Sequence, residues 1–207
     1  MTTPVISPQF GRIFVASDLE QAVLDTLHKW FPTYLREIER QMGIDVGGLI
    51  APKNYSNRNS FDFLSGEAMP KAICISPGTI GSPISTSRDY SVSWAVGVGI
   101  VMAASSEGLA NSQVKIYGAA ARAIVLQELS RTRICRDIRL LSENYEDLGG
   151  ISRQNQHARA AGVYFSIDVP SIITKGGMGI GPDTPDDDPY EYGQVDEVFI
   201  DLEKEDL

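Results

Sequence analysis

The stretch Arg88–Gln127, RDYSVSWAVGVGIVMAASSEGLANSQVKIYGAAARAIVLQ, decides the fold. Its first half alternates large and small side chains as far as Ala103, which is the period of a β-strand. The large residues on one face are Tyr90, Val92, Trp94, Val96, Val98, Ile100 and Met102. Its second half changes to a helical period, with an apolar stripe from Leu109 to Val125. A long strand followed by a long helix is therefore the expected scaffold.

The two faces of this expected strand differ in side-chain size. Small residues, including Gly97 and Gly99, occupy one face, and the helix carries a matching small patch, GAAA, at 118–121. We expect the helix to lie on the small face, and another helix or a neighbouring subunit to cover the large face. At ~3.3 Å per residue the alternating run would span roughly 50 Å. The strand is therefore expected either to bend at Gly97/Gly99 or to project from the body as an arm.

The rest of the chain predicts further elements around this scaffold. Proline disfavours a helix in residues 1–17, which read as an extended arm. The other expected segments are an amphipathic helix capped at Asp18 and ending near Gly43, a loop over 43–70, a strand Lys71–Ser76 ended by Pro77-Gly78, a loop over 79–87, an extended piece Cys135–Leu141, an acidic turn Ser142–Gly150 and a strand Arg159–Val169. The order predicts an α+β fold with a mixed or antiparallel sheet flanked by two main helices.

Charge divides the chain into a body, residues 1–174, and a tail, residues 175–207. The tail holds eleven acidic and two basic residues, which equals the whole formal net charge of −9. A neutral body with an acidic tail argues against nucleic-acid binding, which needs clustered Lys and Arg. The tail begins as an acidic Gly/Pro/Asp linker, yet Val198, Ile200 and Leu202 alternate near its end. We expect this end to pair as a strand with a sheet edge, in its own subunit or in a neighbour.

Motifs that carry chemistry are weak in this sequence. The glycine run 176–181 is followed by Pro182 rather than a helix, so a hinge is favoured over a phosphate loop. The aspartates at 183 and 186–188 do not have the spacing of a calcium loop. No nucleophile motif surrounds His28, His157, Cys74 or Cys135, and both cysteines are expected to be buried free thiols. No catalytic, cofactor-binding or metal-binding residue is therefore expected, and no enzyme activity.

Basic residues concentrate only after the long helix, at Arg131, Arg133, Arg136 and Arg139. They are read either as solvated charges that suit a helix C-terminus, or as an electrostatic contact to an acidic partner. The second reading includes the acidic tail of an adjacent subunit.

Several short motifs, in their order along the chain, resemble the tail terminator proteins of long-tailed bacteriophages (siphophages), in the form common among phages of actinobacteria. After the N-terminal amphipathic helix, these motifs are Ala51–Tyr55, Phe61-Asp62, Ser76-Pro77-Gly78, Trp94–Val98, Ile116–Ala123 and Asp188-Pro189-Tyr190 before the acidic end. The resemblance covers most of the chain, and none of the motifs is catalytic.

The resemblance implies a structural virion protein, made in the host cytoplasm, at the head-proximal end of the tail. It implies a homo-hexameric ring that ends polymerisation of the tail tube protein and joins the tail to the head–tail connector, while DNA passes through the lumen without specific binding. The candidate assembly contacts are Phe61, Phe63, Tyr90, Trp94, Arg133, Arg136, Asp187, Tyr190, Val198 and Ile200.

Two alternatives stay open at this point. One is another head–tail connector component, a neck or stopper protein, which would bind a portal adaptor rather than the tube. The other is a small host binding domain or enzyme, which an ordered polar pocket in a monomer would favour. No apolar run reaches the ~18 residues of a membrane helix, and no signal peptide is expected at the N-terminus.

Overall fold

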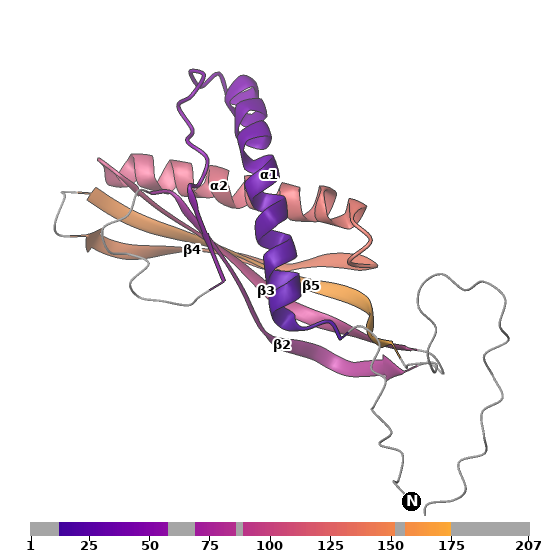
Figure 1. The fold of residues 1–207 in the computed structure, drawn as a ribbon. Coiled ribbons are helices and arrows are strands. Elements are labelled where there is room, and N and C mark those ends of the chain that lie inside the picture. Colours follow the sequence, from indigo (N-terminus) through magenta and orange to yellow (C-terminus); the bar gives the residue numbers. More distant parts are fainter. Residues whose placement is uncertain (1–12, 58–68, 86–88, 152–155, 175–207) are drawn as a thin grey trace, which may run out of the picture.

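The computed structural model describes residues 13–57, 69–85, 89–151 and 156–174. In chain order the elements are α1 (Ala16–Met42), β1 (Asn54–Ser56), β2 (Lys71–Ser85), β3 (Asp89–Ala104), α2 (Glu107–Gln127), the 3-10 turn η2 (Leu129–Arg131), β4 (Asp137–Ile151) and β5 (Gln156–Thr174). The strands form one five-stranded sheet, and both helices lie over the same face of it (Figure 1). The predicted α+β fold is confirmed.

The sheet is built around β3. The strand order is β1-β2-β3-β5-β4, with β1 parallel to β2 and every other pair antiparallel. The pairing of β3 with β5 runs from Asp89↔Thr174 to Ala104↔His157. Figure 1 shows the ends of β2, β3 and β5 nearest Ser85, Asp89 and Thr174 running out beyond both helices. The expected central strand and the hairpin before it are thus present, with β4 as one outer strand.

The helices cover the large face of β3, so the expectation that α2 lies on the small face is wrong. Val96, Val98 and Ile100 are buried in one core with both helices. Close approach of α2 to the sheet occurs at Gly118, where an added Cβ would lie 3.2 Å from the Ala161 Cβ of β5. Covering large aliphatic side chains removes more apolar area from water than covering glycines does, which decides the side. The first helix lies on this same side of the sheet and shares its core, but it packs over β2 and against α2, while α2 lies over β3 and β5.

Three strands are longer than the sequence predicts, and one of them is β5, which spans Gln156–Thr174 rather than Arg159–Val169. β2 continues through Pro77-Gly78 to Ser85, so the prediction of a loop over 79–87 is wrong for residues 79–85. β4 includes the whole segment 142–150 that was expected to be an acidic turn. Both β2 and β4 accommodate the irregular residues by shifts in register, between Ile75 and Gly78 and between Leu140 and Ser142. Pairing with the long neighbours β3 and β5 outweighs the local turn preference of these residues.

The ends of α1 show how its sequence sets its limits. The helix begins at Ala16, so Asp18 is its third residue rather than the predicted cap; its carboxylate accepts from the Val15 N–H at 3.0 Å. It ends at Gly43, as predicted, in the left-handed conformation at φ 67°.

Polar contacts fix α1 to its surroundings. The Glu20 carboxylate accepts from the Ser76 N–H of β2 at 2.6 Å, at the register shift of that strand. The buried Glu39 carboxylate accepts from the Leu49 N–H at 2.7 Å and so holds the chain after the helix. Further along, the Tyr117 hydroxyl of α2 donates to the Ile50 carbonyl at 2.6 Å. These bonds fix the helix layer and leave the opposite face of the sheet without a described helix.

Candidate assembly surface

The face of the sheet opposite the helices, here called the open face, carries the small residues of β3. Register places Gly97 beside Tyr164 and Gly99 beside Gly162, so both strands present side chains of the same face at these positions. On the other side of β3, Ile73 pairs with Gly99 and Ile75 with Gly97. The middle of the open face is therefore a glycine floor between isoleucines on β2 and a tyrosine on β5.

This floor forms an apolar groove with a volume of about 320 Å³. Its lining residues that face this side include Ile73, Ile75, Pro77, Ala95, Gly97, Gly99, Leu141, Gly162 and Tyr164. An added Cβ would lie 3.3 Å from Tyr164 Cε1 if placed on Gly97, and 3.0 Å from Tyr164 Cε2 if placed on Gly162. The tyrosine ring therefore lies against the glycines. At Gly99 the nearest atom to an added Cβ would be the Ile73 Cβ at 3.9 Å, which leaves that position open to the groove.

The rim of the groove exposes large apolar side chains. Leu141 is 54% exposed, Tyr164 40%, and Ile80 further along β2 41%. Leu141 stands at the register shift of β4 that lies between Leu140 and Ser142. Exposed apolar side chains beside an apolar groove are typical of a surface that contacts another protein.

The two edges of the sheet differ. On the β2 side, β1 pairs with Lys71–Ile73 and Pro77, which has no N–H, follows soon after. On the β4 side no described strand follows, so one edge of β4 stays unpaired among the described residues. That edge exposes Leu140 at 40%, Tyr145 at 37% and Leu148 at 36%. A long unpaired edge with apolar side chains is a template for another strand.

The arginine cluster divides into paired and unpaired members. Arg131 Nη1 lies 2.9 Å from Glu128 Oε2, and Arg139 Nε lies 2.7 Å from Asp137 Oδ2. The exposed side chains of Arg133 and Arg136 make no ion pair with a described residue. The Arg136 N–H donates to the Asp168 carbonyl at 2.8 Å, which places this arginine at the start of β4 beside β5. Arg131 and Arg139 are therefore paired within the subunit, and a contact of Arg133 and Arg136 to an acidic partner stays a prediction.

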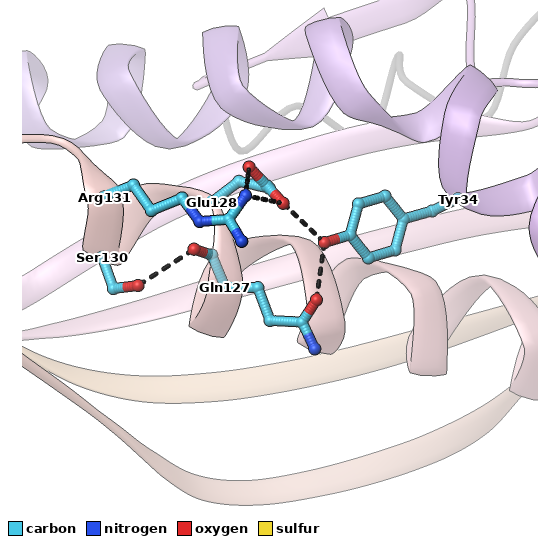
Figure 2. Close-up of polar contacts among 5 residues, drawn as sticks. All are labelled: Tyr34, Gln127, Glu128, Ser130 and Arg131. Atoms are coloured by element: carbon cyan, nitrogen blue, oxygen red, sulfur yellow. Dashed lines mark hydrogen bonds and ion pairs between the residues drawn. The ribbon is translucent and has the colours of Figure 1, made fainter.

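Figure 2 shows what the paired half does. The Tyr34 hydroxyl of α1 lies 2.7 Å from Gln127 Oε1 and 2.8 Å from Glu128 Oε1, and Arg131 holds the same Glu128 carboxylate. Burial, then the hydrogen bond and negative charge of Glu128, raise the pKa of Tyr34 to about 12. The Ser130 hydroxyl donates to the Gln127 carbonyl at 3.0 Å. This cluster ties α1 to the end of α2 and is structural.

A second hollow, about 490 Å³ and mostly polar, lies between α1 and β1. Its lining includes Asp25, His28, Lys53 and Tyr55, and the His28 and Tyr55 rings meet edge to face at 4.9 Å between centroids. The Tyr55 hydroxyl is buried without a hydrogen-bond partner among the described residues, and burial raises its pKa. This hollow is the feature that the binding-domain alternative would use.

Other chemistry finds little support in the described part of the chain. Cys74 and Cys135 are free and buried, as predicted, and burial raises the pKa of both thiols. Within residues 13–57, 69–85, 89–151 and 156–174, His, Cys, Asp and Glu form no group of three or more that could hold a metal ion. Neither described helix is both long and apolar enough to cross a membrane.

The residues predicted as assembly contacts fall into three groups. Tyr90 and Trp94 are half-buried on the large face of β3, where Trp94 packs against the core. Arg133 and Arg136 are exposed before β4. The others lie outside the described residues: Phe61, Phe63, Asp187, Tyr190, Val198 and Ile200.

Sequence reasoning missed the groove residues Leu141, Gly162 and Tyr164. The alternation of Ile73 and Ile75 is visible in the sequence, but only the strand order brings these residues next to Gly162 and Tyr164.

No family model matches the chain, and the search of curated proteins gives no match either.

Proposed function

We propose that this chain is a structural virion protein that forms a ring at the head-proximal end of a siphophage tail tube. In this role it ends tube polymerisation and joins the tail to the head–tail connector. The observation that carries the proposal is the open face, whose apolar groove and exposed rim are covered by no described residue. The order of the sequence motifs adds the resemblance to tail terminators.

The arrangement of surfaces suits a ring. A closed ring of more than two subunits needs heterologous contacts, in which two different patches of one subunit meet those of its neighbours. The open face and the strand ends beyond the helices are two different patches on one subunit. A lumen for sliding DNA should carry no strong positive charge, and residues 1–174 hold equal numbers of acidic and basic residues.

The test measures the mass of the purified full-length chain by light scattering, with negative-stain images of the same sample. Annular hexamers support the proposal, and co-purification with tail tube protein rather than a portal adaptor separates a terminator from a stopper. A monomer that also fails to cap purified tail tubes contradicts it.

The polar hollow between α1 and β1 favours a second candidate, a small binding domain. A thermal-shift screen of polar metabolites on the full-length chain tests it. A shift that His28→Ala abolishes, in a chain that stays monomeric with tail tubes present, would favour this candidate over the ring.

A further inference from the structure

The structure brings together two features that are far apart in the sequence. β4 begins at Asp137, which pairs with Asp168 of β5, and β5 continues past that pair to Thr174. The chain therefore enters its acidic tail at the same end of the sheet where β4 starts and where Arg133 and Arg136 are exposed without a described ion-pair partner.

We propose that the segment Val195–Leu202 of the tail docks as an added strand on the free edge of β4 in its own subunit, with the acidic linker passing Arg133 and Arg136. The proposal does not depend on the proposed ring function. It names the edge of β4 as the binding surface for segment 195–202, which lies outside the described residues.

Length supports docking within one subunit. Thr174 lies six residues beyond Asp168, which corresponds to about 20 Å along a strand. From its length and its Gly/Pro/Asp composition, a random coil of the size of segment 175–194 would have an average end-to-end distance of roughly 25 Å. This average length matches the distance of about 20 Å from the end of β5 back to the start of β4. The effective concentration of the tail segment at the β4 edge of the same subunit is therefore near its maximum, in the range of roughly millimolar.

Side-chain pattern and charge support this edge. Leu140 and Tyr145 point to the helix side of β4, since they pair with the buried Phe165 and Ala161, and both stay partly exposed at the edge. An added strand whose alternate residues are Val198, Ile200 and Leu202 would cover them. The tail carries a formal charge of −9. Arg133 and Arg136, which make no ion pair with a described residue, lie at the end of the sheet where β4 starts and toward which β5 runs.

Hydrogen exchange of the full-length chain, followed on peptides that span 137–148, tests the proposal. A bound strand protects the outward N–H groups of β4, and we expect Val198→Ser with Ile200→Ser to speed their exchange at least tenfold. The matched control is Val46→Ser, which changes an apolar side chain that is 91% exposed after α1 and should leave these peptides unchanged. Arg133→Glu with Arg136→Glu should give a partial effect that grows at low salt.

Equal exchange in the wild type and the double serine variant would overturn the proposal. Protection that disappears on dilution would also overturn it, because the segment would then come from a neighbouring copy. Since neither readout requires a ring or a tail tube, failure here is distinguishable from failure of the proposed function.

Discussion

Gly99→Val fills the floor of the open groove and tests whether that groove is an assembly contact. An added Cβ at this position meets only the Ile73 Cβ at 3.9 Å, an ordinary van der Waals distance, so the two further carbons of valine extend into the groove of about 320 Å³. Glycine inside a strand is less favourable than alanine by about 0.5–1 kcal/mol. We expect the free energy of unfolding to stay equal or to rise by up to about 1 kcal/mol.

Assembly should respond in the opposite direction. A partner side chain that fills the groove gains about 1.5–3 kcal/mol from burial, and valine at 99 would exclude it. At 1.4 kcal/mol per factor of ten, this loss raises the Kd of the contact roughly 10- to 150-fold. Denaturant unfolding gives the stability, and light scattering over a dilution series gives the Kd.

Gly108→Val is the matched control. Gly108 lies in the first turn of α2, is exposed, and has no atom within 4 Å of an added Cβ. Its Kd should equal that of the wild type. An unchanged Kd for Gly99→Val would refute the role of the groove, and a loss of stability above roughly 2 kcal/mol would refute the groove geometry itself, since that size signals overpacking.

Three further predictions concern the helix layer. Glu39→Ala should lower the unfolding free energy by about 1–3 kcal/mol, because the buried Leu49 N–H loses its acceptor. Glu39→Gln keeps an accepting oxygen and should lower the unfolding free energy less. Urea unfolding measures both variants. Phe31→Ala should cost about 3–5 kcal/mol by the same assay, since this ring is fully buried. Because the pKa of Tyr34 is raised to about 12, its phenol contributes stability that is fully present below pH 10 and is lost as pH rises toward about 12. Tyr34→Phe lacks the phenol, so its melting temperature should fall less than that of the wild type between pH 10 and 12.

The sequence predicts the β3–α2 scaffold because each of its halves carries one clear period. The lengths of β2 and β4 could not be predicted, because Pro77-Gly78 and the acidic residues 142–150 favour turns locally and become strand only through pairing with β3 and β5. The prediction of the sheet face that α2 covers was wrong. It relied on the small residues of β3, such as Gly97 and Gly99, which would allow a helix to pack closely. Burial of Val96, Val98 and Ile100 outweighs that fit.

The candidate assembly surface could be predicted from the sequence less well than the fold. Ile75, Gly97 and Tyr164 become neighbours only through the order of β2, β3 and β5 in the sheet, and a single sequence does not contain that order. Pairing of the arginines likewise depends on which acids the fold brings near them. Arg131 and Arg139 pair with described acids, whereas Arg133 and Arg136 in the same run pair with none of the described residues.

The difference between the two sheet edges bears on how folded copies behave when crowded. Fibres that grow by strand addition need two receptive edges on every copy, one to join and one to be joined. Here Pro77 and the Glu20 bond to the Ser76 N–H interrupt the edge of β2, and β4 offers the other. In copies whose tail strand leaves β4, two copies that met through β4 would consume both receptive edges and stop, so this route should yield pairs rather than threads.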